Sequence, residues 1–399
     1  MTQTGQKAHA RFGAALSLQP DSGAAVDEAC RAALSQLGTK PDLAVVFVSP
    51  HHRGQLAQVA VQVCDAIGSE ALLGCTGESI IGGNREIESQ PAVSVWLASL
   101  PNTTIKLMHL NFEQTREGSI FTGWPADLPE PWPAESAMLL LGEPFSFPAD
   151  EVVRRFNEDH PGAPVLGGMA SGGVAPGENR LVLGRGEQIQ GAVAALLYGS
   201  VRIRSVVSQG CRPVGKPYVI TRAESNVIQE LGGAPPLSRL QEVFQTLTEQ
   251  ERWQARRGLH VGRVLSEYQD EFHRGDFLVR NVIGVDPNTG AIAVGDYMRT
   301  GQTVQFHIRD EVTADEDLRH LLRTAVMTGG EPAPAGALLF SCNGRGTRMF
   351  SSSNHDINCL RDILGDIPVA GFFAQGEIGP VGNQNFLHGF TASVALFDG

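Results

Sequence analysis

The chain has 399 residues, 42% of them hydrophobic, and a formal net charge of −12 at pH 7. This length and apolar content suffice for two domains with buried cores, whereas the negative charge disfavours nucleic acid and anionic membrane surfaces as partners. No segment has the length and apolarity of a signal peptide or a membrane span, so the sequence predicts a cytoplasmic protein.

The first predicted elements form a unit of alternating strands and helices. Residues 1–20 are interpreted as a frayed lead-in, after which Asp21 or Ser22 can cap a helix that Gly38 ends. The elements that follow are a strand over 43–48, a helix over 56–67, and strands over 71–75, 92–97 and 105–110. The strand over 71–75 runs into the turn Thr76-Gly77-Glu78.

A fainter copy of this unit follows a proline-rich segment. The segment from Trp124 to Pro133 contains four prolines, which remove backbone donors and keep the chain extended, so we predict a linker. The copy comprises a strand over 137–141, a short helix around 152–156, a strand over 164–168 that enters a glycine-rich turn, and strands over 189–197 and 202–207.

The next part of the chain is predicted to begin a second domain. Its elements are a strand over 214–221, helices over 226–231 and 237–247, a charged segment over 251–257, and strands over 277–283, 291–294 and 303–308. A turn over 286–290 joins two of these strands into a hairpin.

The C-terminal copy of the unit carries most of the polar motifs. An apolar strand over 336–340 ends at Ser341-Cys342-Asn343-Gly344-Arg345-Gly346. Its glycines allow positive φ and expose N–H groups beside a guanidinium, which favours anion binding. A helix that Asn354 or Asp356 can cap follows, and Gly365 ends it.

Two further motifs complete this copy. A strand over 368–373 enters Gln375-Gly376-Glu377-Ile378-Gly379-Pro380, a turn that fixes the backbone around one carboxylate. The last strand opens at Phe386-Leu387-His388-Gly389-Phe390-Thr391. Three copies of one unit at unequal intervals indicate duplication and not a solenoid of fixed period.

Three blocks of the C-terminal copy resemble the C-terminal part of the FIST domain: FSCNGRG, GFFAQGEIGP and FLHGFTASVALF. The stretches from Asn281 to Asp286 and from Val304 to Asp310 resemble hairpins of the same domain, so the resemblance runs from about residue 40 to the end. FIST domains are sensory domains of bacterial signalling proteins and of some eukaryotic F-box proteins. The resemblance implies small-ligand sensing and suggests amino acids. Because the resemblance covers the chain without a separate output domain, the chain is expected either to signal through a separate partner or not to signal at all.

Opposite charges on the C-terminal motifs suggest a site for a zwitterion. Arg345 is predicted to bind a ligand carboxylate bidentately and Glu377 an ammonium, in a pocket at the strand ends, so the ligand would be an amino acid or a similar metabolite. Arg345, Glu377 and His388 are expected within ~15 Å of one another. The candidate ligand-binding residues are Gly77, Glu78, Cys342, Asn343, Gly344, Arg345, Gly346, Gly376, Glu377, Ile378, Gly379, His388, Gly389 and Thr391.

The same motifs allow other interpretations. Cys342 and His388 could form a nucleophile and base, or Cys342 could be a small buried thiol at a strand end. Glu78 and Glu377, at matching places in two copies, could form an acid–base pair, or each could bind the N–H groups of its own turn. His388 could equally be a core histidine.

The remaining cysteines and the missing signatures argue against cofactors. Cys30, Cys64, Cys75, Cys211 and Cys359 are spread singly, which predicts free thiols and no disulfide or zinc site. No familiar hydrolase, zinc-protease or nucleotide-binding motif occurs in the sequence. We therefore predict neither an enzyme nor a bound metal or cofactor.

The sequence thus predicts a mixed α/β (α+β) fold of two domains, with duplicated strand–helix–strand–strand units and sheets covered by helices. The predicted divisions are a lead-in and helix over 1–40, a FIST N-terminal domain over 41–213 and a FIST C-terminal domain over 214–399. The predicted function is a bacterial small-ligand sensor. The alternatives are a cysteine-dependent enzyme and a protein-interaction scaffold.

Overall fold

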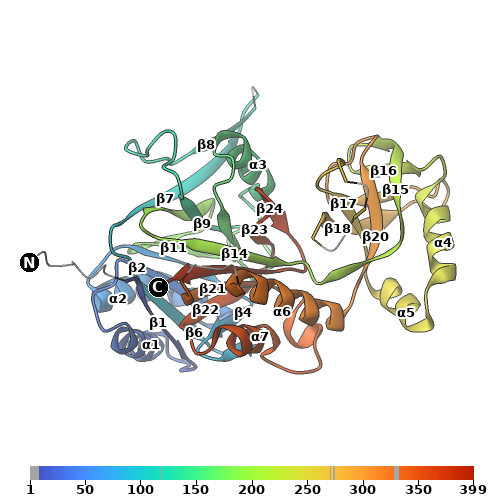
Figure 1. Cartoon of the computed structure of the whole chain (residues 1–399). Coiled ribbons are helices and arrows are strands. Elements are labelled where there is room, and N and C mark those ends of the chain that lie inside the picture. The colour runs from blue at the N-terminus through green and yellow to red at the C-terminus, as the bar shows by residue number, and fades with distance from the viewer. Residues whose placement is uncertain (1–8, 117, 270, 273–274, 328–331) are drawn as a thin grey trace, which may run out of the picture. The chain divides into compact units, whose positions relative to one another are not determined.

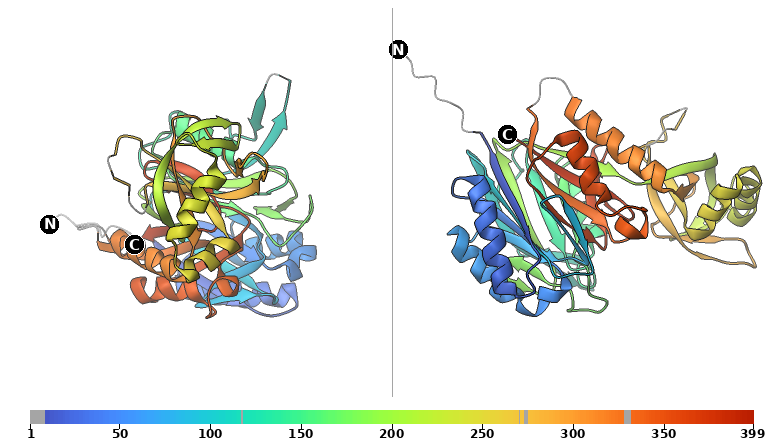
Figure 2. Two further views of the ribbon diagram at one scale, coloured as in Figure 1. Left: turned by 90° about the vertical axis from the view of Figure 1, so that its right-hand side faces the viewer. Right: turned by 90° about the horizontal axis from the view of Figure 1, so that it is seen from below.

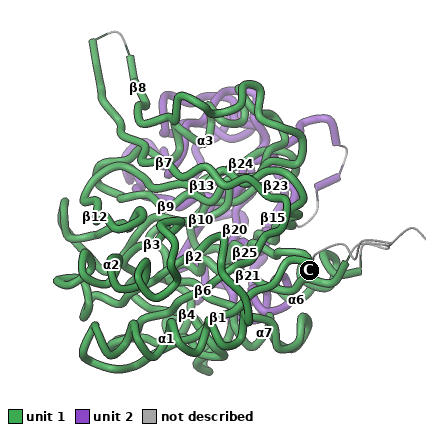
Figure 3. The backbone as a smooth tube through the Cα atoms, turned by 90° about the vertical axis from the view of Figure 1, so that its left-hand side faces the viewer, with its two compact units in different colours: residues 1–208, 318–399 green, residues 209–317 purple. Residues whose placement is uncertain are grey.

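The computed structural model describes residues 9–116, 118–269, 271–272, 275–327 and 332–399. The chain divides into two compact units (Figure 3): unit 1 comprises Met1–Ser208 and Leu318–Gly399, and unit 2 comprises Gln209–Asp317. The mixed α+β class and the presence of two units confirm the sequence prediction. Residues 318–399 belong to the same compact unit as the N-terminal part of the chain, because their strands pair with strands of that part.

Unit 1 contains three sheets, one around each copy of the repeated unit. Sheet 1 has the order β1 (Arg11–Ser17), β6 (Val93–Ser99), β2 (Leu43–Val48), β3 (Leu72–Thr76), β11 (Leu181–Leu183) and β12 (Gly186–Gln188). Sheet 2 has the order β24 (Gln384–His388), β23 (Glu377–Val381), β10 (Val165–Met169), β9 (Ala137–Gly142), β13 (Ala192–Gly199), β7 (Thr103–Gln114) and β8 (Ser119–Thr122). Sheet 3 has the order β14 (Ile203–Ser208), β25 (Ala392–Asp398), β21 (Pro334–Cys342), β22 (Val369–Ala374), β4 (Ser79–Gly82) and β5 (Arg85–Glu88).

Three glycines establish which positions of the three repeats correspond. Each lies in the second strand of a parallel pair, opposite a residue of the first strand. The pairs are Gly74 with Val46, Gly167 with Leu140 and Gly371 with Leu339. A Cβ at the three glycines would lie 2.3, 1.8 and 1.8 Å from the partner's backbone oxygen. The same close backbone approach therefore recurs in every repeat, which supports the predicted duplication.

The variant Gly371→Ala tests this close approach. We expect a loss of about 3 kcal/mol or more, because the new methyl group would overlap the carbonyl oxygen of Leu339, which a buried sheet holds in place. Urea unfolding of the purified protein measures the loss. The matched control is Gly54→Ala, since no atom lies within 4 Å of a Cβ built there. Equal urea midpoints for the two variants would contradict the proposed constraint.

Each sheet is completed by a hairpin from another repeat. The hairpin β4–β5 of the first repeat pairs with β22 in sheet 3. The hairpin β11–β12 of the second repeat pairs with β3 in sheet 1, and β23–β24 of the third pairs with β10 in sheet 2. The three repeats thus exchange hairpins in a cycle, so the strands of one repeat alone do not complete a sheet.

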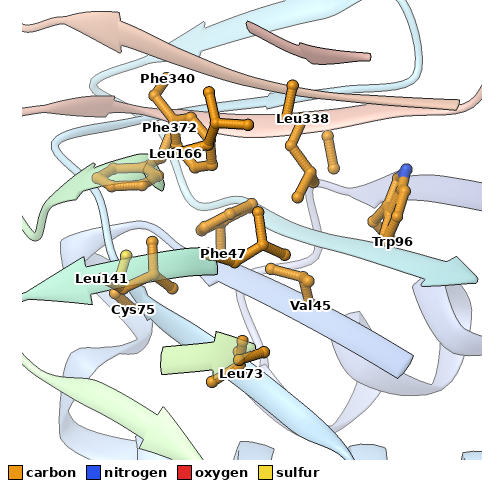
Figure 4. Packing of buried hydrophobic residues seen from close by; sticks show 14 of the residues in the cluster. Val45, Phe47, Leu73, Cys75, Trp96, Leu141, Leu166, Leu338, Phe340 and Phe372 are labelled. Carbon is orange, nitrogen blue, oxygen red and sulfur yellow. The ribbon is translucent and has the colours of Figure 1, made fainter. Parts of the chain in front are cut away.

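The inner faces of the three sheets enclose one hydrophobic core (Figure 4). The labelled residues come from all three sheets: Val45, Phe47, Leu73, Cys75 and Trp96 from sheet 1, Leu141 and Leu166 from sheet 2, and Leu338, Phe340 and Phe372 from sheet 3. The Phe47 ring centroid lies 6.4 Å from that of Phe340 and 5.0 Å from that of Phe372. Strands buried on both faces explain why the central segments read as continuous apolar runs.

Helices cover the outer faces of the sheets, as predicted. On sheet 1 lie α1 (Ser22–Leu37) and α2 (Leu56–Ile67), on sheet 2 lies α3 (Ala149–Asp159), and on sheet 3 lie α7 (His355–Leu364) and the unit 1 part of α6 (Glu311–Met327). Short 3₁₀ helices span Pro50–Gln55 and Gly346–Arg348. Figures 1 and 2 show α6 and α7 side by side, where Arg319 and Asp362 form an ion pair of 2.9 Å. Asp21 caps α1 and Gly38 ends it, as the sequence predicted.

The described part of unit 2 comprises a closed barrel, two helices of its own and the first residues of α6. Its strands, in barrel order, are β15 (Cys211–Glu224), β16 (Val227–Leu231), β19 (Ile292–Val294), β18 (Phe277–Val285), β17 (Leu259–Val264) and β20 (Thr303–Arg309). The helices are α4 (Pro236–Thr246) and α5 (Glu249–Arg257). No helix in the described part of the chain is both long enough and apolar enough to span a membrane.

Two local predictions were wrong, and a third was right only in part. Residues 11–17 of the expected lead-in form β1, which pairs with β6 along its whole length. The helix predicted over 226–231 is the strand β16, whose edges pair with β15 and β19. The predicted linker over 124–133 contains no helix or strand and is mostly exposed or half-buried, but its Trp132 is buried and stacks on His160 with ring centroids 3.8 Å apart. In each case tertiary pairing or packing decided the structure, and local propensity did not.

Candidate functional site

The turns that follow the parallel strand pairs of unit 1 meet at one end, which we call the strand-tip end. The backbone N–H of Glu78 donates to the hydroxyl of Ser171 at 2.7 Å, and that hydroxyl donates to the carbonyl of Phe373. The N–H of Gln375 donates to the carbonyl of Met169 at 3.0 Å. Segments of all three repeats are therefore joined directly by hydrogen bonds at this end.

The correspondence of the repeats differs from the one predicted. Glu78, Ser171 and Gln375 each follow their repeat's close-approach glycine by four residues. The counterpart of Glu78 is therefore Gln375, and Glu377 lies two residues further on, so the predicted match of Glu78 with Glu377 is wrong. Glu377 also lies inside sheet 2, opposite Gly168 of β10, where its side chain is fully buried.

Arg345 is part of an internal ion pair. Its side chain is 0% exposed, and its Nε and Nη2 each donate to a carboxylate oxygen of Asp356 at 2.7 Å. Ser341 donates to the same carboxylate at 2.6 Å, and the guanidinium lies 5.2 Å over the ring of Phe350. Burial by itself would raise the pKa of Asp356, but attraction and hydrogen bonds from Arg345 lower it below its usual range.

This pairing argues against the prediction that Arg345 binds a ligand carboxylate bidentately. The fork of the guanidinium that would bind a ligand carboxylate already binds Asp356, and both partners are buried. The sequence prediction for Arg345 is corrected accordingly: it stabilises the turn after β21 from inside. Asn354 does not cap α7 with its side chain either. Its side-chain oxygen accepts from the N–H of Glu86 at 2.7 Å instead.

Four of the predicted residues form a buried polar cluster. Thr391 donates its N–H to Glu377 at 3.0 Å and accepts at its carbonyl from the N–H of Cys342 at 2.9 Å. His388 lies opposite Glu377 in the β23–β24 pairing, and its Nε2 donates to the carbonyl of Gly379 at 2.9 Å. Cys342, the most exposed of the four, is only 9% exposed. The tertiary structure thus gathers these residues, but as a hydrogen-bonded part of the interior.

The predicted glycines at this end mostly permit close packing. A Cβ at Gly77 would lie 2.7 Å from Cβ of Phe372, and one at Gly379 would lie 2.6 Å from Val207. Gly346 has φ +58° and packs against Phe373. Gly376 packs near Leu387, and Gly344 donates its N–H to the sulfur of Cys342 at 3.4 Å. Gly389 is the exception, since no atom lies within 4 Å of a Cβ built there. Ile378 belongs to the hydrophobic core of sheet 2.

The exposed charges at the strand-tip end belong to residues that the sequence reading only partly identified. Glu78 forms an ion pair with Arg348, whose Nη1 also donates to the carbonyl of Asn343 at 2.9 Å. The side chains of Arg348 and Glu78 are 59% and 33% exposed. Arg348 was missed because it follows the glycine motif by two residues. The signal available in the sequence was a second arginine directly after the turn.

A cavity of about 650 Å³ lies at the other end of unit 1, where β6, β13 and β25 end. We call it the far-end cavity. Its polar lining residues include Asn102, Thr103, Glu135, Ser200, Arg202 and Asp398. These residues lie at or next to the ends of strands from all three sheets, so all three sheets contribute to the cavity wall.

The far-end cavity brings together charges of both signs. Arg202 and Glu135 are exposed, and neither has an ion-pair partner among the residues that the structure describes. Asp398 is 8% exposed and forms an ion pair with Arg204. The sequence reading missed this cavity because its residues come from separate loops with no shared motif, so only the folded chain assembles them.

Two family models match consecutive parts of the chain. The FIST N domain matches residues 42–234 and the FIST C domain matches residues 236–380. An uncharacterized protein of Mycobacterium tuberculosis strain H37Rv is 44% identical over 388 residues, which cover 97% of this chain and 99% of that protein. An uncharacterized protein of Mycobacterium bovis is 43% identical over 389 residues, which cover 97% of this chain and 98% of that protein.

Proposed function

The chain belongs to the FIST family, whose two domains span nearly all of it, and we propose that it is a sensory protein that binds an amino acid or a similar small zwitterion. In this proposal the bound ligand changes the chain's interaction with a separate signalling protein. The family supports a sensory, ligand-binding role in general. The choice of ligand and of site rests on the charges and the cavity of unit 1.

The far-end cavity is the observation that supports the proposal most. Its volume of about 650 Å³ falls within the ~300–1,000 Å³ that is usual for small-molecule sites. The exposed guanidinium of Arg202 suits a ligand carboxylate, which it can bind through two parallel N–H groups. Glu135 and Asp398 suit an ammonium. An amino acid carries both groups, which is why we favour this ligand class.

The strand-tip end is a second place for the same ligand. There the exposed pair of Glu78 and Arg348 is the supporting observation, because an exposed ion pair contributes only ~0–1 kcal/mol and a zwitterion can replace it at little cost. In this version Arg348 takes the role that the sequence assigned to Arg345. We rank it below the far-end cavity, whose volume and wall are defined by residues of all three sheets.

Calorimetric titration with a panel of amino acids tests both the ligand and the place. We expect at least one amino acid to bind, and Arg202→Ala to weaken that binding by ~10–100-fold through loss of a charge-assisted hydrogen-bond pair. The matched control Arg348→Ala should bind like the unaltered protein. The reverse pattern would move the site to the strand-tip end, and a panel without any binding would reject the amino-acid proposal.

A further inference from the structure

Arg204 connects the wall of the far-end cavity with the end of helix α6. Its side chain, on β14, is 15% exposed. Its Nε donates to Asp398 at 3.0 Å, and its Nη2 donates to the same carboxylate oxygen and to the carbonyl of Pro332 at 2.8 Å. Its Nη1 donates to the carbonyl of Ala325. Asp398 and Pro332 line the cavity, whereas Ala325 belongs to α6.

The contact with Ala325 stabilises the last described turn of α6. Ala325 lies two residues before Met327, the last described residue of α6. No N–H among the described residues of the helix is placed to donate to its carbonyl, which accepts from Arg204. A guanidinium at this position both satisfies that carbonyl and interacts favourably with the negative end of the helix dipole. The last described turn of α6 therefore contacts a cation that donates from two of its nitrogens to the Asp398 carboxylate.

We propose that Arg204 is the positioning residue through which occupancy of the far-end cavity reaches α6, an inference that rests on the proposed binding of a ligand amine in this cavity. An ammonium group beside Asp398 competes with Arg204 for the carboxylate and repels the guanidinium. The guanidinium then holds the carbonyl of Ala325 less firmly, and the last turn of α6 opens more often.

The place of α6 in the chain makes this contact useful for signalling. Residues 311–317 of the helix group with unit 2, and residues 318–327 group with unit 1. Leu318 and Leu322 are fully buried in the core under sheet 3, whereas Ala325, in the last described turn, is only partly buried against it. The last turn, which Arg204 holds, is the part whose stability a change in the cavity can alter.

Amide hydrogen exchange of the last turn of α6 measures the contact without any ligand. We expect exchange in Asp398→Asn and in Arg204→Gln to be roughly tenfold faster or more, as the loss of a charge-assisted hydrogen bond implies. The matched control is Arg185→Gln. Arg185 is exposed and forms ion pairs with Asp65 and Glu70, and none of the three lines the far-end cavity or belongs to α6. Unchanged exchange in Asp398→Asn would overturn the proposal.

A second arm separates transmission from a merely structural role. Millimolar ethylammonium chloride should speed exchange of the same turn in the unaltered protein but not in Asp398→Asn, and sodium propionate should not speed it in either. Unchanged or slower exchange with the amine would show that Arg204 has only a structural role in the cavity wall, and would reject the relay. An amino acid that binds in the titration without affecting α6 would leave the proposed function intact and reject this relay. If the amine speeds exchange in α6 but no amino acid binds, the relay is supported and the amino-acid proposal is rejected.

Discussion

Replacement of Arg345 by alanine is expected to destabilise unit 1 by about 3–5 kcal/mol, because it leaves the Asp356 carboxylate buried without its cation. Asp356 is 1% exposed and takes two hydrogen bonds from Arg345, so water cannot replace the lost charge without opening the structure. Urea unfolding of the variant and of the unaltered protein measures the difference in the free energy of unfolding.

A double variant distinguishes the loss of the pair from a general loss of packing. Replacing both partners, Arg345→Met with Asp356→Leu, should recover most of the stability, since a buried ion pair can often be exchanged for apolar residues of similar volume. The exposed pair of Arg361 and Asp366 provides the control, and Arg361→Ala should cost less than about 1 kcal/mol.

The same variant decides between the two roles considered for Arg345. A protein with Arg345→Ala that unfolds at the same urea concentration as the unaltered one, but no longer binds amino acids, would show that the guanidinium serves a ligand. That outcome would restore the interpretation drawn from the glycine motif. A strongly destabilised variant would establish the internal role that the contacts with Asp356, Ser341 and Phe350 indicate.

Unit 2 is expected to lose stability as the pH falls from about 6.5 to about 4. Burial lowers the pKa of His260 to about 4, with a further contribution from the charge of Arg309. Burial also lowers the pKa of His307 to about 4, with a smaller contribution from His260. The two histidines lie opposite each other in the β17–β20 pairing. In the unfolded chain a histidine titrates near ~6.5.

The sign of the effect follows from which state binds protons first. Between pH 6.5 and 4 the unfolded chain takes up protons at these histidines and the folded barrel does not, so lowering the pH favours unfolding. A pKa lowered by this amount corresponds to about 3 kcal/mol for each histidine. The stabilising contribution is complete above the unfolded pKa and is lost progressively toward pH 4.

Variants without these imidazoles test the assignment. His260→Asn with His307→Asn should flatten the dependence of the free energy of unfolding on pH in this range, measured by urea unfolding at several pH values. His51→Asn is the control, because His51 is exposed and lies outside the barrel. A double variant as acid-sensitive as the unaltered protein would mean that other groups, such as the carboxylates, cause the loss.

Much of the fold could be predicted because local pattern carries it. The cap at Asp21 and the stop at Gly38 depend on hydrogen bonds between residues of the same turn, so the local sequence is enough to predict them. The buried strands of the three repeats are apolar on both faces, which makes them visible as continuous runs. The FSCNGRG block and its companions likewise identified the family from short contiguous stretches, and the family models confirm it.

The site could be predicted only in part, because partners distant in sequence decide what a polar residue does. Gly344 and Arg345 form the expected turn, yet the guanidinium binds Asp356, eleven residues later, in place of a ligand. Glu377 was expected at an open rim, but the exchange of hairpins places its strand inside sheet 2. Nothing near Arg202 or Glu135 marks them as neighbours of one cavity.

The linear order of residues therefore settled the repeats, the ends of α1 and the family, which short stretches of sequence carry. The folded chain settled which edge each hairpin joins, which charges are neutralised inside and where a hollow remains. These outcomes depend on long-range strand pairing and on the desolvation of charges, and neither leaves a periodic trace in the sequence.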